Sequence, residues 1–491
     1  MVLAQYTIRS KQDYIFRTNR IVEIVGASKI ISDVWNDLFR IASGKGFNVI
    51  RNTGDDFDYD SIKAQLKENT LIELFQGGGN LTVIYDSKES FVSLNKSFSY
   101  FVIKERPGLI PMAVCTNLTG DYSADYAKLM EESEIEKNRM NPGRDRFILP
   151  FSKMDRDVFL PIAGEYLIDG PKTDISYESA AKRKIGIEIR DNSKSVRFLD
   201  EMVTKKNEES LLAVVHADGN NMGRKIMGFL ADDSDYGTCV SKMRKFTKTT
   251  AEAFSVNGIE ALEKCRLELI GKNPNLKERA FAYRIIVADG DDFTFICNAR
   301  FAMEYTRAYL KAVDSFRSEW KYSSCAGICI FHSHYPFSKA YSLAEQACDD
   351  GAKKMVHSLN GDNLEEAWVD FHYIHSGVGG DLSVIRHNER TEDSMARPWL
   401  ITGPCRSERH FGKLTEIKKA FDTHHIPRSA IKEIGSSWES SKTAGRQTLI
   451  RICGKNRGLE EDLKKVMPAE EQLFRAIYDL SEIYDLWFEE V

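Results

Sequence analysis

Arg284-Ile-Ile-Val-Ala-Asp-Gly-Asp-Asp-Phe-Thr-Phe-Ile-Cys297 is the most informative segment in the second half of the chain. Two apolar runs flank a short acidic turn, a pattern that predicts a β-hairpin. Asp-Gly is a common hairpin turn dipeptide, so Asp289 and Gly290 alone indicate only an ordinary turn. Asp291 and Asp292 add two carboxylates that a turn does not need. Because crowded like charges repel one another unless a cation neutralises them, the tip predicts a metal site.

A second acidic motif lies upstream, in Leu211-Leu-Ala-Val-Val-His-Ala-Asp-Gly-Asn-Asn-Met-Gly223. Its apolar run predicts a buried strand that ends near Asp218. We expect Gly219 and Gly223 to let the backbone turn tightly into the next helix. Asn220 and Asn221 would shape this turn, and they are also candidates for contacts with phosphate or sugar. The motif therefore places a third carboxylate at a strand end.

The three carboxylates, Asp218, Asp291 and Asp292, are the predicted catalytic and metal-binding residues. Mg²⁺ prefers oxygen ligands and usually binds one or two carboxylates together with substrate phosphates. Carboxylates on neighbouring strands can hold two ions at the spacing used in phosphoryl transfer. We therefore expect two ions, Mg²⁺ or Mn²⁺, and a nucleoside triphosphate as substrate, with Gly290 of the turn close to the nucleotide.

Length and composition set the class of protein. The 491 residues leave room for about two to four domains. The formal net charge of −5 gives no global basic field that would indicate an obligate nucleic-acid binder. The nine cysteines form no CxxC pair, which predicts reduced, mostly buried thiols and no zinc ribbon. Without a signal-peptide pattern or an apolar run of membrane-spanning length, we expect a cytoplasmic protein that has no membrane partner.

The acidic hairpin has a counterpart near the amino terminus. Residues 75–85, Phe-Gln-Gly-Gly-Gly-Asn-Leu-Thr-Val-Ile-Tyr, align without gaps with residues 287–297. Gly78 then matches Gly290, whereas Gly79 and Asn80 stand where the second copy has its acidic pair. The first copy thus lacks the metal ligands and is predicted to be catalytically silent. Its turn, formed by Gly78, Gly79 and Asn80, could still admit a nucleotide close to the backbone.

Each copy has the pattern strand, helices, hairpin, helix, strand and helix. This order predicts an α+β fold with two ferredoxin-like βαββαβ domains. In the first copy we expect strands at 3–9, 70–76, 81–86 and 109–116, helices at 27–43 and 87–104, and an extra strand at 47–52. In the second copy we expect strands at 211–217, 280–288, 293–298 and 323–331, and helices at 223–230, 237–262, 299–319 and 337–356.

The remaining segments complete the domain organisation. We expect domains at 1–140 and 206–376, a connecting region with short strands or loops at 141–205, and a linker at 377–409. Glycine and proline interrupt any regular pattern in the linker. The segment 410–491 carries amphipathic runs of helical length and predicts a small helical domain.

Several motifs together resemble the large polymerase-cyclase subunit of type III CRISPR effector complexes. The first copy contributes Ile8-Arg-Ser-Lys-Gln-Asp-Tyr-Ile-Phe-Arg-Thr-Asn-Arg20, Glu23-Ile-Val-Gly-Ala-Ser-Lys29 and Gly77-Gly-Gly-Asn80. The second contributes Asp218-Gly-Asn-Asn-Met-Gly223, the acidic hairpin, Ala326-Gly-Ile-Cys-Ile-Phe-His-Ser-His-Tyr-Pro336 and Ala352-Lys-Lys354. The resemblance spans most of residues 1–375 and implies two palm domains of the GGDEF or nucleotidyl-cyclase type.

The resemblance also implies an activity. In that family the active palm joins ATP molecules into cyclic oligoadenylate second messengers, using a GGDD hairpin. Asp218 and Asp291 would hold metal, Asp292 would be a further ligand or would activate the attacking hydroxyl, and Lys353 or Lys354 would reach the triphosphate. The implied enzyme is thus a pyrophosphate-releasing nucleotidyltransferase that acts in antiviral defence.

The sequence departs from the family pattern at three points. Asp289 replaces the first glycine of GGDD, which would crowd the nucleotide or add an acidic ligand. We also find no histidine-aspartate nuclease motif before the first copy and no cysteine cluster that matches the family's zinc insert. We therefore expect a compact relative, acting alone or with effector-complex subunits.

Two alternatives remain open. The same scaffold could make a cyclic dinucleotide or a cyclic mononucleotide. The protein could instead be a nonenzymatic RNA-binding subunit, for which the sequence offers a basic set near the carboxy terminus, namely Arg446, Arg451, Lys455 and Arg457. Such a cluster is more often a solvated helical face.

Overall fold

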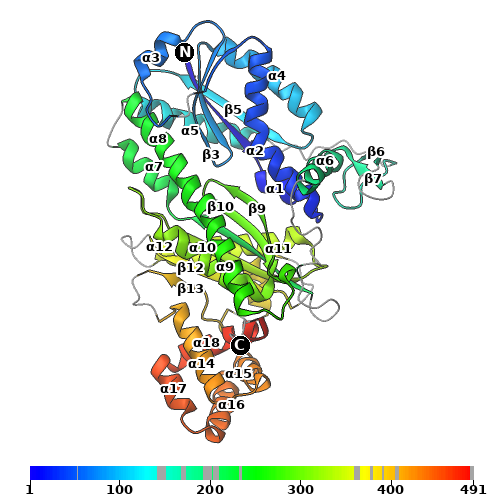
Figure 1. The fold of residues 1–491 in the computed structure, drawn as a ribbon, viewed down its shortest axis with the longest axis vertical. Coiled ribbons are helices and arrows are strands. Elements are labelled where there is room, and N and C mark those ends of the chain that lie inside the picture. Colours follow the sequence, from blue (N-terminus) through cyan, green and yellow to red (C-terminus); the bar gives the residue numbers. More distant parts are fainter. Residues whose placement is uncertain are drawn as a thin grey trace. The chain divides into compact units, whose positions relative to one another are not determined.

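The computed structural model describes residues 1–51, 54–140, 151–166, 173–191, 202, 210–231, 235–358, 365–375, 380–389, 392–403 and 408–486. The chain folds into two compact units (Figure 1). The first unit comprises Met1–Ser195, Asn221–Ser255 and Ile286–Asp291, and the second comprises Val196–Asn220, Val256–Ile285 and Asp292–Val491. This division passes through the acidic hairpin, so the hairpin tip is counted with the first unit.

The first unit is built around a five-stranded sheet with the order β2-β3-β4-β1-β5. Its strands are β1 (Val2–Arg9), β2 (Asn48–Arg51), β3 (Thr70–Gly77), β4 (Asn80–Tyr85) and β5 (Ile110–Asn117). The predicted extra strand at 47–52 is thus confirmed as β2, which pairs in parallel with β3. The other neighbouring strands pair in antiparallel fashion.

Helices cover both faces of this sheet because its central strands alternate between two apolar sets. Tyr6, on one face, packs on the rings of Trp35 and Phe98 from α2 (Ile21–Gly44) and α4 (Lys88–Glu105). Leu3 and Ile84, on the other face, join a buried cluster with side chains of two further helices, α5 (Tyr122–Arg139) and α8 (Tyr236–Ala251). Three short helices also belong to the unit, namely α1 (Lys11–Phe16), α3 (Tyr59–Gln65) and α7 (Met222–Ala231).

The second unit is built around a six-stranded sheet with the order β13-β12-β11-β8-β10-β9. Its strands are β8 (Leu211–Gly219), β9 (Tyr283–Asp289), β10 (Asp292–Asn298), β11 (Ser324–His332), β12 (Ala367–Tyr373) and β13 (Trp399–Thr402). On one face lie α9 (Asn257–Lys272) and α10 (Ala302–Ser315), joined to the strands by short 3₁₀ turns at Glu278–Phe281 and Ala299–Phe301. On the other lie α11 (Phe337–Gln346), the π-helix η5 (Ala347–Lys353) and α12 (Lys354–Ser358).

The two sheets share one topology. The order β3-β4-β1-β5 in the first corresponds to β9-β10-β8-β11 in the second, as the sequence duplication requires. Tyr6 pairs with Leu81, and Ala217 pairs with Phe293. By this register Thr7 of the first copy occupies the position of Asp218. The α+β class with two ferredoxin-like domains is therefore confirmed, and the first copy lacks all three acidic residues.

Some predicted segments differ from the structure. The second sheet has two strands that the prediction omitted, β12 and β13, and β12 runs parallel to β11. The predicted linker at 377–409 contains β13 and a helix, α13 (Leu382–Asn388). The predicted helix at 237–262 extends to residue 272 and is interrupted by a π-helix at Glu252–Val256. The two compact units do not follow the predicted domain bounds, which remain a prediction.

The connecting region also contains more structure than expected. The predicted short strands are present as β6 (Ile162–Tyr166) and β7 (Thr173–Ser176), but α6 (Tyr177–Asp191) was not predicted. This helix packs closely on α2, since a Cβ added to Gly26 would lie 1.9 Å from the carbonyl oxygen of Lys182. Buried ion pairs, such as Arg183 with Glu23, lie at the same contact. The helix α6 was not predicted because its charged residues indicated a solvated segment, whereas some of them form buried ion pairs against α2.

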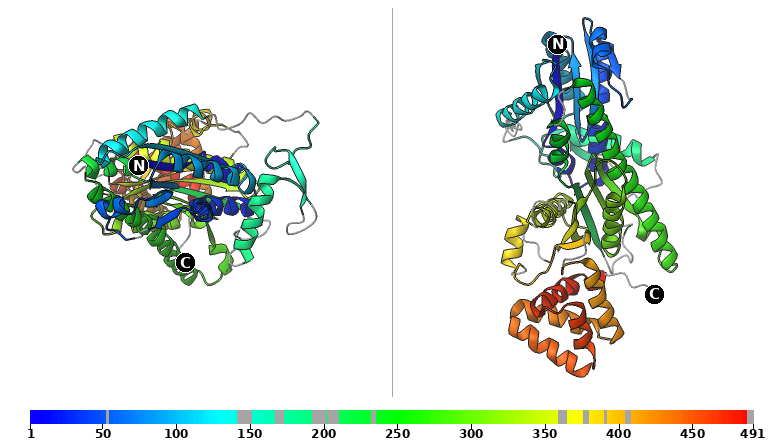
Figure 2. Two further views of the ribbon diagram at one scale, coloured as in Figure 1. Left: turned by 90° about the horizontal axis from the view of Figure 1, so that it is seen from above. Right: turned by 90° about the vertical axis from the view of Figure 1, so that its left-hand side faces the viewer.

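The carboxy-terminal segment is helical, as predicted. It contains α14 (Phe411–Thr423), α15 (Arg428–Ser440), α16 (Lys442–Lys455), α17 (Leu459–Val466) and α18 (Glu470–Ile483), followed by a 3₁₀ turn at Tyr484–Leu486. These helices form a group of their own within the second unit (Figure 2). Among the described residues, no helix is long and apolar enough to cross a membrane. None of the described cysteines forms a disulfide, and most of them are buried.

Candidate functional site

Asp218 and Asp292 lie at the ends of neighbouring strands. Strands β8 and β10 pair in antiparallel fashion, with Phe293 opposite Ala217. Asp292 is the next residue outward on β10, so the register places it beside Asp218. The two side chains are 28% and 12% exposed, respectively, and a ligand could therefore reach them from the sheet end. Two of the three predicted carboxylates are thus brought together within the second unit.

The turn that carries the acidic pair depends on one glycine. Gly290 has φ +65°, a left-handed conformation in which an L side chain is strained. In the first copy both Gly78 and Gly79 adopt positive φ, at +59° and +75°. Asp291, which matches Gly79, is not among the described residues with positive φ. The turn of the second copy is therefore built differently, so that its second position accepts an aspartate.

Lys353 is the cation beside Asp218. Its ammonium group forms an ion pair with Asp218 Oδ2 and lies 3.7 Å from Asp349 Oδ1. Burial opposes the charge of this lysine, but Asp218, Cys348 and Asp349 together outweigh burial and raise the pKa of Lys353 above its usual value. Lys354 lies 67% exposed and pairs with Asp350 at 2.9 Å. Of the two lysines that the sequence proposed together, only Lys353 lies at the site.

Packing of the π-helix η5 places Lys353. A Cβ added to Gly327 of β11 would lie 2.0 Å from the Ala344 carbonyl oxygen, so the preceding helix lies directly on the sheet. Gly351 of η5 approaches Asp370 of β12 equally closely, since its added Cβ would lie 2.0 Å from Asp370 Oδ2. π-Helical turns occur often at functional sites. This one brings its last residue, Lys353, to the end of β8.

His216 is a site residue that the sequence analysis missed. It lies on β8 two residues before Asp218, hence on the same face of the sheet. Its Nδ1 atom lies 3.6 Å from Asp292 Oδ1 and 3.1 Å from the Thr294 hydroxyl oxygen. Its ring contacts Tyr341 of α11 edge to face, with centroids 5.6 Å apart. The alternation of residues along the strand was the signal that could have identified it.

Two further groups on α11 respond to the acidic site. The Tyr341 hydroxyl donates a hydrogen bond of 3.2 Å to Glu345 Oε1. Burial raises the pKa of Glu345, and Asp349 and Asp292 make smaller contributions in the same direction. His216 and the hydrogen bond from Tyr341 act in the opposite direction. Burial and the Asp292 carboxylate likewise raise the pKa of Tyr341. The surroundings of Asp292 are therefore rich in negative charge.

The turn after Asp218 differs in detail from the prediction. The residue with positive φ is Asn221, at +56°, whereas Gly219 ends β8 and Gly223 lies in α7. Neither glycine adopts a positive φ, and asparagine supplies the left-handed conformation of the turn itself. Asn220 is buried, and its amide donates to Ser323 Oγ at 2.9 Å and to the Glu366 carbonyl at 3.0 Å. Asn220 thus secures the strand end.

Asp289, the residue that departs from GGDD, belongs to the first unit. Its Oδ2 atom lies 3.4 Å from Lys11 Nζ, at the start of α1. The same oxygen would lie 3.3 Å from a Cβ added to Gly79. A Cβ added to Gly290 would lie 3.1 Å from Gly78 Cα. Asp289 is therefore engaged by a lysine beside the glycine turn of the first copy.

The donor set suits a hard divalent cation. Carboxylate oxygens are the ligands that Mg²⁺ favours, and the ammonium group of Lys353 shows that a cation is stabilised beside Asp218. Among the described residues, no three His, Cys, Asp or Glu side chains are already gathered in a metal-binding group. Asp218 and Asp292 therefore present oxygen donors of the kind that such an ion requires.

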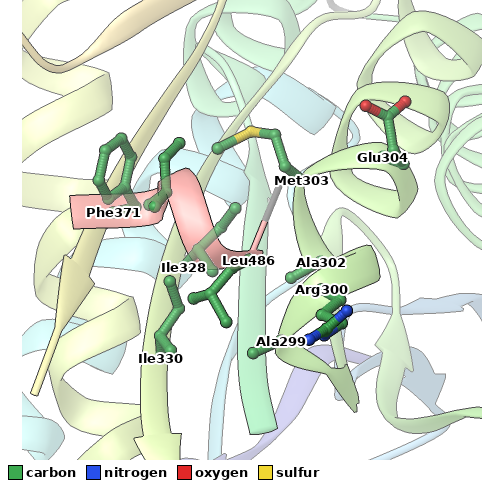
Figure 3. A pocket seen from close by; sticks show the side chains of 10 residues that line it. Ala299, Arg300, Ala302, Met303, Glu304, Ile328, Ile330, Phe371 and Leu486 are labelled. Atoms are coloured by element: carbon green, nitrogen blue, oxygen red, sulfur yellow. The ribbon is translucent and has the colours of Figure 1, made fainter. Parts of the chain in front are cut away.

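An apolar cavity lies on the other face of the second sheet. The cavity is lined by Ala299, Arg300, Ala302, Met303, Glu304, Ile328, Ile330, Phe371, Ile483 and Leu486 (Figure 3). Ile328 and Ile330 alternate along β11 with Gly327, which contacts α11. The cavity therefore opens on the α10 face, whereas Asp218 and His216 face α11 and η5. It is not part of the candidate site.

Two of the four residues in the basic set near the carboxy terminus pair with carboxylates. Arg446 Nε donates to Glu470 at 2.9 Å, and Arg451 pairs with Glu433 at 2.6 Å. These arginines lie on helical surfaces, each with an acidic partner. The structure therefore gives no added support to the RNA-binding alternative at this position.

Comparison with known proteins is consistent with this site. Residues 211–359 match the family model described as Cas10/Cmr2, second palm domain. This range includes β8, the acidic hairpin and Lys353. No curated protein matches the sequence.

Solved structures share the fold over nearly the whole chain. The crystal structure of a Csm1-Csm4 cassette in complex with pppApA has 13% identity and a TM-score of 0.50, and the match covers 98% of this chain and 69% of that one. The apo Csm1-Csm4 cassette gives the same values. Csm1 in T. onnurineus has 12% identity and a TM-score of 0.45, with coverage of 98% and 69%. Residues 211–359 thus match a second palm domain of the Cas10/Cmr2 type, and the chain as a whole shares the fold of the similar chain in the Csm1-Csm4 cassette structures.

Proposed function

We propose that the protein is a nucleotidyltransferase that converts ATP into a cyclic oligonucleotide second messenger in antiviral defence. The observation that carries this proposal is the pairing of Asp218 with Asp292 at the ends of β8 and β10, beside Lys353. The Cas10/Cmr2 second palm match supports it. So does the pppApA complex of the similarly folded Csm1-Csm4 cassette.

The reaction joins two nucleotides. A ribose hydroxyl of one attacks the α-phosphorus of the other, a new O–P bond forms, and the bond to pyrophosphate breaks with its electron pair on the leaving group. Two divalent ions, when bound, lower the pKa of the hydroxyl and offset charge on the leaving oxygens. Asp218 and Asp291 would hold the ions, and Asp292 would complete the set or accept the hydroxyl proton. Lys353 would contact the triphosphate as a point charge.

His216 and the first copy would act through position. His216 contacts Asp292 and Thr294 and is itself held by Tyr341, so it fixes the orientation of the acidic side chain. The glycine turn of the first copy, with Gly78, Gly79 and Asn80, would lie close to a nucleotide without binding metal. Positioning of this kind accounts for much of the rate of phosphoryl transfer.

Product analysis tests the proposal. The native protein and an Asp291→Ala, Asp292→Ala double variant would be incubated with Mg²⁺ or Mn²⁺ and each nucleoside triphosphate, and the products identified by mass spectrometry. We expect cyclic oligoadenylate from ATP and a loss of at least about 100-fold in the double variant. A cyclic dinucleotide or a cyclic mononucleotide as product would select that alternative on the same scaffold. No product from any triphosphate, together with copurified RNA, would favour a nonenzymatic subunit.

A further inference from the structure

The ion pair between Lys353 and Asp218 lies where the proposed function requires a metal ligand. Both side chains are partly buried, at 19% and 28% exposure, so water screens the pair only in part. Asp349, one helical turn earlier, lies 3.7 Å from the same ammonium group. Lys353 thus has a second carboxylate within reach, and this one is 54% exposed.

An ammonium group and a divalent ion compete for one carboxylate oxygen, because the two cations repel each other at that separation. Lysine offers three donors and no acceptor, so Lys353 cannot itself become a ligand of the ion. A divalent cation that coordinates Asp218 Oδ2 would displace the ammonium and repel it as a like charge. The backbone of η5 lies close against Asp370 at Gly351, and the movement that the exchange requires is one of the lysine side chain.

We propose that Lys353 exchanges partners during nucleotide binding, neutralising Asp218 when no divalent ion is bound and moving to the triphosphate when an ion takes its place. This inference rests on the proposed function and adds a step to it. Lys353 keeps the acidic site from accumulating unbalanced negative charge, and it makes metal binding and triphosphate binding mutually dependent. Because coupling between two ligands is reciprocal, each would favour the binding of the other.

The exchange is tested by a variant in which the affinities for Mn²⁺ and for the nucleotide should change in opposite directions. Mn²⁺ affinity without nucleotide would be measured by paramagnetic resonance of free Mn²⁺, and affinity for a non-hydrolysable ATP analogue by calorimetry. Lys353→Met should bind Mn²⁺ at least about threefold more tightly, because the competing charge is gone, and the analogue about tenfold more weakly. A lysine with only a structural role would not move the two affinities in opposite directions.

Matched controls separate this effect from net charge. Lys354→Met removes the same charge one residue away, where the side chain is exposed and pairs with Asp350, and it should change neither affinity. Lys353→Arg keeps the charge and should keep the weaker Mn²⁺ binding. Equal Mn²⁺ affinities for the Lys353→Met and Lys354→Met variants would overturn the exchange while leaving the proposed function intact. If Asp218→Asn does not weaken Mn²⁺ binding, the ion binds elsewhere and the proposed function itself fails.

Discussion

At the scale of single residues, the acidic pair could be identified from the sequence, whereas the residues around it could not. Asp291 and Asp292 could be found from sequence because a turn has no need of such charge. His216 could not be separated from the apolar strand around it, because a lone polar residue in a strand is usually a core residue. Lys353 and Lys354 could not be told apart either, because a π-helix shifts which side chain faces the sheet, and sequence periodicity does not show this shift.

His216 supplies the residue-scale prediction. His216→Ala should remove the contacts with Asp292 and Thr294 and lower kcat by about 10- to 100-fold, because a small misplacement of reacting groups is costly. His216→Asn keeps a polar atom near the position of Nδ1 and should retain most of the rate. Steady-state kinetics with separate kcat and KM values would check this. Equal losses in the two variants would show that the imidazole contributes something other than this contact.

At the scale of elements, periodicity predicted the four strands that each copy shares, and it failed where charge is buried. Strand β12 alternates apolar residues with Asp370 and His372, a pattern typical of a strand with one solvated face. Both polar side chains are buried in the structure, since Arg386 forms a bidentate pair with Asp370. Burial, with the nearby arginines, lowers the pKa of His372 to about 3. Sequence shows the charges of such a network but not their pairing.

The contact of η5 with β12 gives the element-scale prediction. Gly351→Ala would push a Cβ into Asp370 Oδ2, which Arg386 holds in place. We expect a loss of about 1–3 kcal/mol in the free energy of unfolding, and weaker binding of the triphosphate through Lys353. Denaturant unfolding and calorimetry would measure the two effects. Gly271→Ala in α9 is the control, because its Cβ meets no atom within 4 Å. If the two variants are equally stable, this packing account is wrong.

At the scale of the whole molecule, the duplication of the sheet topology could be predicted, whereas the division into compact units could not. Helices α7 and α8 follow β8 in sequence, yet they are clustered with the first unit. Within the second unit, α18 is joined to β12 and β13 by buried charges. Arg397 contacts Asp370, Asp479 and Glu482. Such pairing between residues far apart in the sequence depends on the assembled fold, so no local sequence pattern predicts it.

This buried cluster predicts a pH dependence. Burial, assisted by Glu482 and opposed by Arg397, raises the pKa of Asp479 to about 7, compared with about 3.9 in an unfolded chain. Its contribution to stability is therefore complete below about pH 4 and is lost as the pH rises through about 7. Between pH 5 and 8 the free energy of unfolding of the native protein should fall by on the order of 2 kcal/mol. The Asp479→Asn variant should not show this decrease. Thermal unfolding across this range would measure the difference, and identical slopes would contradict the assignment.

The proposed function requires that Asp218 and the acidic hairpin bind divalent ions against a triphosphate. Anomalous scattering from Mn²⁺ in crystals grown with a non-hydrolysable ATP analogue would locate these ions. We expect a Mn²⁺ peak at about 2.0–2.3 Å from carboxylate oxygens of Asp218 and the acidic hairpin, with Lys353 moved from Asp218 to the phosphates. Bound nucleotide without a peak there, and with Lys353 still paired to Asp218, would contradict it.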